Sequence, residues 1–339
     1  MTVGIGVARA ARCGALLMAL LLAARAAAAE DIKIGYIKVT ALAPVMVAAA
    51  KGYFSAEGLN AELVAFDAPV PVAQAVVSGG VDFGATGPSA AFYNLAGPGA
   101  LHIIAGLARE QPSFQFLAVL ASNRAYAAGL TSVKALAGHS VAVSDIGGAA
   151  HYSLVLIEDK YRIDPSSVRV TPLQGISSAI SALAGGSVDA SVSPSTAFAP
   201  VIERGDAKLL AYVGDETPWQ AGILYTTRKT ADERRDTVEK VLRAMKKATR
   251  DYHDAFTGPD ERRKDGPTAP EMLALLSKQV GQSPEQVGRA IAYVDRDARL
   301  DVKDIQHQIE FLRAQGLIKG AVDADAIIDK RYVVPLPAK

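Results

Sequence analysis

The stretch Ala75–Asp82, AVVSGGVD, and the stretch Ala182–Asp189, ALAGGSVD, are two copies of one phrase in this chain. Each copy runs from an apolar, helix-like segment through a double glycine to a Val-Asp pair, and each continues through a short strand to Pro-Ser. The two aspartates lie 107 residues apart, whereas the repeats of a solenoid recur every few tens of residues. The spacing predicts two similar α/β lobes, and two lobes create a cleft in which a ligand can bind.

Residues 1–29 have the pattern of a secretory signal peptide. Arg9 and Arg12 precede an uncharged apolar run from Gly14 to Ala24, and Ala27-Ala28-Ala29 offers small residues for cleavage. The run is too short for a permanent transmembrane helix, so an uncleaved anchor is the less favoured alternative. The pattern predicts cleavage after Ala29 and a periplasmic protein.

Charge and cysteine content exclude several classes of function for the mature chain. Cleavage leaves 310 of the 339 residues and removes three arginines and no acid, so the formal charge falls from +1 to −2. This balance favours neither nucleic acid nor an anionic membrane as a partner. Cys13 is the only cysteine and lies in the predicted signal, which leaves no thiol for a disulfide, a metal site or a nucleophile. The five histidines have no metal-ligand spacing, and we expect no metal ion and no cofactor.

Strand-like and helix-like segments alternate along the rest of the chain. In the first half, the pattern predicts strands at 32–36, 63–66, 83–85 and 102–105 and helices at 43–51 and 72–77. In the second half, it predicts strands at 140–143, 168–171 and 188–192 and helices at 149–161 and 177–183. This alternation is typical of a mostly parallel sheet with helices on its faces, and therefore of an α/β fold.

Two short apolar segments, 116–120 and 223–226, bracket the second set of elements, and we interpret them as the crossings between the lobes, hence the hinge. Lobe I then consists of residues 30–119 and 222–339, and lobe II consists of residues 120–221. After Arg228 the pattern becomes helical, because apolar residues from Val238 to Phe256 keep the spacing of three and four of one buried helix face. The mixed charges of residues 259–266 indicate an exposed loop.

Four motifs resemble the solute-binding proteins of ABC importers for nitrate, sulfonates, taurine and thiamine-precursor pyrimidines. They are Lys51–Leu59 (KGYFSAEGL), Ser78–Gly84 (SGGVDFG), Leu136–Val143 (LAGHSVAV) and Leu183–Asp189 (LAGGSVD). The resemblance extends from about residue 31 to residue 228, and the helical tail is compatible with it. It implies the type II periplasmic binding protein fold, with two α/β lobes, a two-segment hinge and a helical C-terminal region.

The ligand site is predicted from the rule that ligands bind beyond the carboxyl ends of parallel strands, where loops lead into helix starts. Four such loops, at 38–44, 86–89, 144–151 and 193–196, carry small residues that allow backbone amides to approach a ligand. Helix starts also attract anions without any lysine. The candidate ligand-binding residues are Tyr36, Thr40, Ala41, Leu42, Thr86, Gly87, Pro88, Ser89, Arg109, Gly147, Gly148, Ala149, His151, Ser193, Pro194, Ser195 and Trp219.

The loop Gly147-Gly148-Ala149-Ala150-His151 resembles the glycine-hydroxyl-hydroxyl-x-histidine pattern of that family, but Gly148 and Ala149 lack the two hydroxyls. This departure favours a ligand with an apolar body over a small, strongly hydrated anion. Arg109 is expected either to bind a carboxylate of the ligand or to form an ion pair with Glu110 or another acid. His151 is expected either to face the ligand or to fill the first turn of its helix, and the second role is favoured.

The sequence therefore predicts a receptor that is not an enzyme. It would capture a small organic anion, a sulfonate or an aromatic or aliphatic carboxylate, and deliver it as a monomer to a membrane permease driven by an ATPase. The alternative is a secreted enzyme acting on a small aromatic or pyrimidine compound, although related enzymes depend on a cysteine that this chain lacks. A third, weaker alternative is a soluble sensor for a membrane-bound signalling protein.

Overall fold

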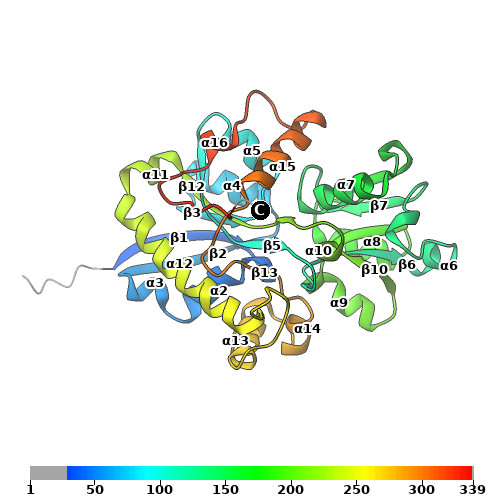
Figure 1. Cartoon of the computed structure of the whole chain (residues 1–339), viewed down its shortest axis with the longest axis horizontal. Helices are drawn as coiled ribbons and strands as arrows, with labels where there is room; N and C mark the ends of the chain where they lie inside the picture. Colours follow the sequence, from blue (N-terminus) through cyan, green and yellow to red (C-terminus); the bar gives the residue numbers. More distant parts are fainter. Residues whose placement is uncertain (1–28, 338–339) are drawn as a thin grey trace, which may run out of the picture.

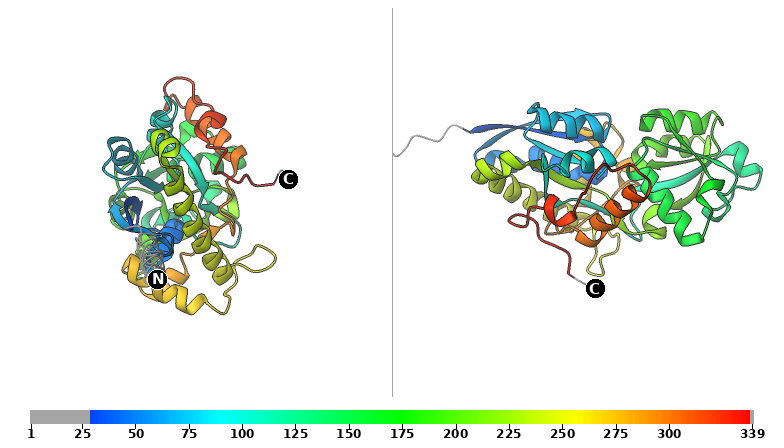
Figure 2. Two further views of the ribbon diagram at one scale, coloured as in Figure 1. Left: turned by 90° about the vertical axis from the view of Figure 1, so that its left-hand side faces the viewer. Right: turned by 90° about the horizontal axis from the view of Figure 1, so that it is seen from above.

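Two five-stranded sheets form the centres of two α/β lobes in the computed structural model, which describes residues 29–337 (Figure 1). The first sheet contains, in spatial order, β2 (Leu59–Phe66), β1 (Glu30–Ile37), β3 (Phe83–Thr86), β12 (Ile223–Thr227) and β4 (Leu101–Gly106). The second contains β10 (Ala207–Tyr212), β6 (Leu117–Ser122), β9 (Ala190–Pro194), β7 (Ser140–Val143) and β8 (Arg169–Pro172). Seen from above in Figure 2, the lobes lie end to end along the longest axis of the molecule.

The predicted mostly parallel arrangement is confirmed in both sheets. In the first sheet β1 pairs in parallel with β2 and β3, and only β12 runs against its neighbours β3 and β4. In the second sheet β7 pairs in parallel with β8 and β9, and only β6 runs against its neighbours β9 and β10. Each sheet therefore directs the carboxyl ends of four strands toward one edge, where a ligand site is expected.

The two segments interpreted as crossings belong to strands of the sheets. The segments 116–120 and 223–226 lie mainly in β6 and β12, which are the first strand of each lobe after the chain has crossed. Every residue of β6 is buried, and its first five residues are apolar, so it lacks the alternation that marks a half-exposed strand. The chain crosses beside β5 (Ala108–Glu110) and β11 (Trp219–Gln220), which pair antiparallel and form a small sheet with β13 (Tyr293–Val294).

Helices cover the sheets at the predicted positions. Lobe I carries η1 (Thr40–Leu42), α2 (Ala43–Ala50), α3 (Tyr53–Ala56), α4 (Pro69–Ser78) and α5 (Ala90–Ala96). The chain of lobe II forms α6 (Asn123–Ala127), η2 (Val133–Ala135), α7 (Ala149–Tyr161), η3 (Pro165–Ser167), α8 (Ile176–Ala184), α9 (Ser195–Glu203) and α10 (Val213–Glu216). Proline near the start of α2 and α4 fixes a helical φ angle where no amide donor is needed.

Most of the C-terminal helices pack on the first lobe, and α14 also contacts α9 of lobe II. They are α11 (Arg228–Glu233), α12 (Arg235–Phe256), α13 (Ala269–Val280), α14 (Pro284–Gly288), α15 (Val302–Ala314) and α16 (Ala324–Ile327). The predicted apolar stripe of α12 is buried at Val238, Val241, Met245, Tyr252 and Phe256. The charged residues 259–266 form a loop, as expected.

The two copies of the repeated phrase make the same contact in each lobe. The carboxylate of Asp82 accepts a hydrogen bond from the amide of Lys33 at 2.7 Å, and that of Asp189 accepts one from the amide of Ser140 at 2.9 Å. In both cases the partner lies 49 residues earlier, at or near the start of a strand that pairs in parallel with the strands on both of its sides, β1 in lobe I and β7 in lobe II. The two aspartates therefore connect the turn of each repeated phrase to a neighbouring strand.

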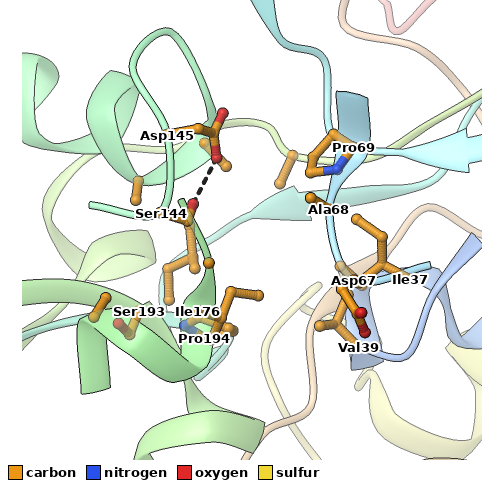
Figure 3. Close-up of a pocket in the computed structure, with 18 of the residues that line it drawn as sticks. Ile37, Val39, Asp67, Ala68, Pro69, Ser144, Asp145, Ile176, Ser193 and Pro194 are labelled. Carbon is orange, nitrogen blue, oxygen red and sulfur yellow. Dashed lines mark hydrogen bonds between the residues drawn. The ribbon is translucent and has the colours of Figure 1, made fainter. Parts of the chain in front are cut away.

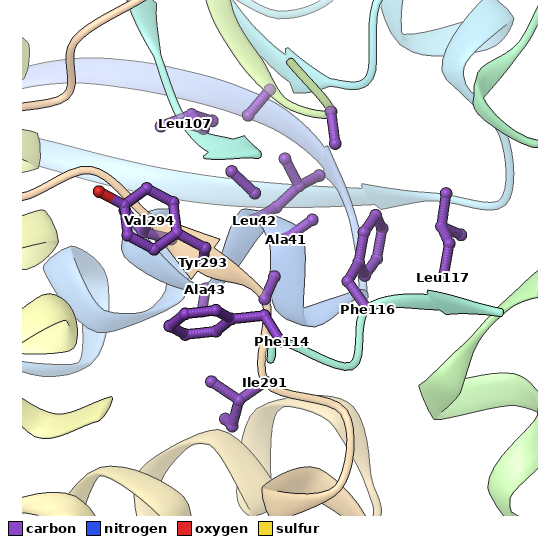
Figure 4. Packing of buried hydrophobic residues seen from close by; sticks show 14 of the residues in the cluster. Ala41, Leu42, Ala43, Leu107, Phe114, Phe116, Leu117, Ile291, Tyr293 and Val294 are labelled. Atoms are coloured by element: carbon purple, nitrogen blue, oxygen red, sulfur yellow. The ribbon is translucent and has the colours of Figure 1, made fainter. Parts of the chain in front are cut away.

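A continuous apolar core extends from the first lobe through the crossing (Figure 4). Phe114 and Tyr293 pack edge to face with their ring centroids 5.2 Å apart, and Phe116 and Leu117 continue the contact toward the second lobe. The same cluster includes residues of both sheets, such as Ile34 of β1 and Val141 of β7. This core fixes the position of the sheet edge in each lobe at which the parallel strands end.

Candidate functional site

A cavity of about 420 Å³ lies between the two lobes. Loops that follow β1, β2 and β3 line it from one side, and loops that follow β7, β8 and β9 line it from the other (Figure 3). Its lining residues are Ile37, Val39, Ala41, Leu42, Asp67, Ala68, Pro69, Val70, Pro71, Gly87, Pro88, Phe116, Leu117, Ser144, Asp145, Ala149, Ala150, Gln174, Gly175, Ile176, Ala179, Val192, Ser193, Pro194 and Ala221. Because both lobes contribute, a ligand bound here contacts the two of them at once.

Four helices of nine or more residues begin at this cavity. The residues that precede α4, α8 and α9, namely Ala68, Gly175 and Pro194, line it, as do the first two residues of α7, Ala149 and Ala150. The first amides of a helix have no partner within the helix, and the helix dipole places partial positive charge there. The cavity therefore offers backbone donors from both lobes.

The lining is mostly apolar and has two carboxylates. Asp145 lies on the lobe II wall and Asp67 on the lobe I wall (Figure 3). The Ser144 hydroxyl donates a hydrogen bond of 2.6 Å to Oδ1 of Asp145. Burial raises the pKa of Asp145 above its ordinary value, although the bond from Ser144 opposes this change. No lysine, arginine or histidine belongs to the described residues that line this cavity.

A second hollow of about 500 Å³ adjoins the cavity and shares several of its lining residues, including Asp67 and Gln174. Lys38 and Gln282 also line this hollow. A cation is therefore present beside the cavity, on the same wall as Asp67, and not within its lining.

Seven of the predicted site residues line the cavity. They are Ala41, Leu42, Gly87, Pro88, Ala149, Ser193 and Pro194. All four loops expected from the strand-end rule contribute at least one residue to the lining. Their contact with a ligand remains a prediction.

The other predicted hydroxyl residues lie in the same loops but use their oxygens within the fold. Thr40 donates to the carbonyl of Ala290, Thr86 to the carbonyl of Gly87 at 2.9 Å, and Ser195 to the carbonyl of Gln115. Ser89 accepts a hydrogen bond from the amide of Phe92 at 3.2 Å and so caps α5. None of these four side chains belongs to the lining.

Gly147, Gly148 and His151 form the turn into α7. The amide of Gly147 donates to Nδ1 of His151 at 3.0 Å, and Gly147 has a positive φ of 75°, a conformation that favours glycine. His151 is buried, its ring packs against Phe311, and burial lowers its pKa. The histidine thus fills the first turn of its helix, in line with the favoured expectation.

Arg109, Tyr36 and Trp219 do not line the cavity. Arg109 forms an ion pair of 2.8 Å with Asp301, so its partner is an acid other than Glu110. Tyr36 and Trp219 are buried in the core, and Trp219 packs edge to face on Tyr152 with ring centroids 5.2 Å apart. The aromatic ring that does line the cavity in the described part of the chain is that of Phe116.

Two loops and one residue at the crossing line the cavity but are absent from the residues predicted to bind the ligand. Residues 67–71 follow β2 and residues 174–176 follow β8, and both loops lead into helices. The strand-end rule could have identified them, because both strands and both helices are visible in the sequence. Phe116 was assigned to the hinge alone, since nothing in its apolar surroundings indicates which way the ring points.

Other kinds of site receive no support from residues 29–337. Within this range no group of three or more histidine, aspartate or glutamate side chains is placed to hold a metal ion. No helix in the same range combines the length and apolar character needed to cross a membrane. The predicted signal peptide and Cys13 lie outside the described residues.

Three of the solved structures that are similar to this chain are binding proteins for sulfonates or nitrate. The chain is similar to the periplasmic aliphatic sulphonate-binding protein SsuA from Escherichia coli, with a TM-score of 0.70 and 18% identity over 91% of this chain and 94% of that protein. It is similar to the alkanesulfonate-binding protein SsuA from Xanthomonas axonopodis pv. citri bound to MOPS, with a TM-score of 0.71 and 20% identity over 89% of this chain and 99% of that protein. It is also similar to the periplasmic nitrate-binding protein NrtA from Synechocystis PCC 6803, with a TM-score of 0.66 and 15% identity over 88% of this chain and 84% of that protein.

At these identities the likeness establishes the fold, and it confirms the predicted fold class. No curated protein matches the chain in sequence. A family model described as NMT1/THI5 like matches residues 39–261, which is more than half of the chain. The protein therefore belongs to the NMT1/THI5-like family.

Proposed function

We propose that this protein is the periplasmic substrate-binding component of an ABC importer. It captures a small organic anion with an apolar body in the cavity between its lobes and presents the loaded form to a membrane permease and its ATPase. The observation that carries the proposal is the shared lining, to which both sheets contribute the loops at their strand ends. The names of the structural neighbours, which are periplasmic sulfonate-binding and nitrate-binding proteins, support the same function.

The geometry of the cavity explains how binding would be signalled. A ligand that touches one lobe alone has equal affinity for the open and closed forms and leaves their balance unchanged. A ligand that touches residues of both walls, such as Pro69 on lobe I and Ile176 on lobe II, binds the closed form more tightly. The permease can then distinguish loaded from empty receptor by the relative position of the lobes.

The lining also fits the predicted ligand chemistry. The starts of α8 and α9 present amides beside Gly175 and Pro194, and neither helix start has a carboxylate among the lining residues next to it. A sulfonate or carboxylate group can bind there through backbone donors. Val192, Ile176, Phe116 and Pro69 supply apolar surface for the rest of the molecule.

Thermal-shift screening tests this proposal. The mature protein is heated with alkane sulfonates, aromatic and aliphatic carboxylates, and pyrimidines, alongside nitrate and sulfate as inorganic controls. A true ligand at one hundred times its Kd stabilises the folded form by about 2.7 kcal/mol. Stabilisation by inorganic anions alone would contradict the apolar body, and no stabilisation by any compound, organic or inorganic, would contradict the receptor function.

Mass spectrometry of the bound molecule separates the receptor from the secreted enzyme that is the alternative. After prolonged incubation with an identified ligand, the protein is denatured and the released molecule is weighed. A receptor returns the compound unchanged and in a ratio of one per chain. A change in mass, growing with time of incubation, would instead support the enzyme.

A further inference from the structure

Asp145 has a position in the cavity that its neighbour Gly148 makes possible. The carboxylate lies so close to Gly148 that a Cβ on this residue would be 2.0 Å from Oδ2 of Asp145. Gly148 is the residue that immediately precedes α7, and its φ of −96° is one that any residue can adopt. The glycine therefore provides space for the carboxylate at the start of α7 and is not required by the backbone.

The charge of Asp145 has no cationic partner in the described part of the chain. Its hydrogen-bond partner there is the Ser144 hydroxyl, which occupies one of the roughly four acceptor sites of a carboxylate. The lining contains no lysine, arginine or histidine within residues 29–337, and the opposite wall adds the second carboxylate, Asp67. Lys38, in the adjoining hollow, lies on the side of Asp67 and not on that of Asp145.

A carboxylate in such a place needs donors from the ligand. Transfer of an ionised group from water into an apolar cavity is costly unless it is hydrogen-bonded or paired. The carboxylate of Asp145 also neutralises the start of α7, so this helix start does not attract a second anion. The two ends of the cavity thus differ in chemistry, with bare helix starts at α8 and α9 and acceptor oxygens at Asp145.

We infer that Asp145 is a specificity-determining residue that selects ligands presenting an N–H donor or an ammonium group to the lobe II wall. This inference rests on the proposed receptor function and adds a second polar requirement to the ligand, beside its anionic group. The anionic group binds at α8 and α9, and the nitrogen group binds at Asp145. A ligand with an anion at both ends is excluded by repulsion from the carboxylate.

Matched pairs of compounds, identical except for one amino group, test the inference. The first pair is 4-(aminomethyl)benzoate and 4-methylbenzoate, and further pairs use alkanoate, alkane sulfonate and pyrimidine bodies. Binding of each compound is measured by calorimetry to the mature wild-type protein, to Asp145→Asn and to Asp159→Asn. Asparagine keeps the size of the side chain and an oxygen that can accept from Ser144, and Asp159→Asn makes the same change of charge at an exposed site on α7.

In the pair whose apolar part fits the cavity, the wild type is expected to bind the compound with the amino group at least about ten-fold more tightly than the compound without it. This ratio is the one expected for a charge-assisted hydrogen bond. Asp145→Asn is expected to remove this preference, and Asp159→Asn to preserve it. If the carboxylate served only to cap α7, Asp145→Asn would change the melting temperature and leave the ratio of the affinities for the paired compounds unaltered.

Two results would overturn the inference. One is equal or tighter binding of the compounds without nitrogen to the wild type, and the other is a preference that survives in Asp145→Asn. In either case ligand binding itself would still support the receptor function. Failure of every compound in every pair to bind would contradict the receptor function and the inference together.

Discussion

Glu158 is a carboxylic acid whose neutral form is favoured by burial. Its side chain on α7 is 2% exposed, and its Oε1 has no hydrogen-bond partner in the described structure. Burial, with a smaller contribution from the neighbouring charge of Asp159, raises its pKa from 4.5 to about 7. The folded protein therefore binds a proton between these two values that the unfolded chain releases.

Stability is expected to depend on pH through this residue. Because the folded pKa is the higher one, the contribution of Glu158 is present below pH 4.5 and is lost as the pH rises through about 7. Glu158→Gln, which cannot ionise, should match the wild type in acid and exceed its free energy of unfolding at pH 8 by about 1–3 kcal/mol. Urea unfolding across this range measures the difference, with the exposed Glu310→Gln as control. A constant difference at all pH values would contradict the assignment.

Substitution of Gly148 tests whether the loop before α7 belongs to the ligand site. A Cβ at this position would lie 2.6 Å from Cγ of Asp145, so a larger side chain must displace the carboxylate into the cavity. Gly148→Val should therefore abolish binding of an identified ligand, while the melting temperature changes little. Gly80→Ala is the matched control, because a Cβ there meets its nearest atom at an ordinary 3.5 Å and the residue does not line the cavity. Unchanged affinity of Gly148→Val would remove this loop from the site.

In each lobe, one aspartate of the repeated phrase binds the backbone of a neighbouring strand. Asp189 accepts hydrogen bonds from the amide and the hydroxyl of Ser140, at 2.9 and 2.8 Å. Burial alone would raise the pKa of Asp189, but these bonds, together with nearby positive charge, outweigh it and hold the pKa below its ordinary value. The stability that this carboxylate contributes is thus present at neutral pH and is lost in acid as the pH falls through its folded pKa.

Loss of either aspartate should weaken only its own lobe. Asp189→Ala is expected to cost about 1–3 kcal/mol and to speed amide exchange in β7 and β9, because the amide of Ser140 loses its acceptor. Asp82→Ala should do the same in β1 and β3, where the carboxylate accepts from Lys33. Hydrogen exchange followed by mass spectrometry compares the two variants. Equal acceleration in both lobes for either variant would contradict the view of two repeated units.

The repeated elements could be predicted from sequence, because their helices and strands carry strong local patterns. The double glycine before Asp82 and Asp189 marks the ends of α4 and α8, and small residues mark the loops at the strand ends. The exact positions at which the chain crosses between the lobes could not be predicted, because β6 is buried throughout and its apolar sequence shows no alternation that would mark it as a strand. The division of the chain at 119/120 and 221/222 remains a prediction.

The direction in which individual side chains point could not be predicted from the sequence. The partner of Arg109, Asp301, lies 192 residues further along the chain, and no local pattern connects the two. Tyr36 and Trp219 carry large rings of a kind that often lines a pocket, yet both are buried in the apolar core. Loops at a site are therefore predictable from topology, whereas the individual contacting residues depend on tertiary packing.

At the scale of the whole molecule, contacts between α7 of lobe II and α15 of lobe I join the lobes beside the cavity. The Tyr152 hydroxyl donates to Oδ1 of Asp304 at 3.1 Å and lies 2.8 Å from Nδ1 of His307. The other oxygen of Asp304 accepts from the amide of Gln220 in β11, at 2.8 Å. Asp304 thus connects a helix of each lobe with one strand of the crossing.

Tyr152→Phe should shift the balance of the lobes toward separation. The variant keeps the ring packed against Trp219 and Phe311 and removes only the hydroxyl that crosses between the lobes. Ligand affinity measured by calorimetry is expected to fall about three- to ten-fold, because closure loses one hydrogen bond to a carboxylate. Tyr161→Phe on the same helix is the control, since its hydroxyl bonds Glu216 within lobe II. Equal loss in both variants would contradict a role between the lobes.

The central claim is that a small molecule between the lobes draws them together. Small-angle X-ray scattering of the wild-type protein, with and without a saturating amount of an identified ligand, measures this most directly. The account predicts a smaller radius of gyration in the loaded protein, because the ligand contacts both walls of the cavity at once. An unchanged radius of gyration at full saturation would contradict it.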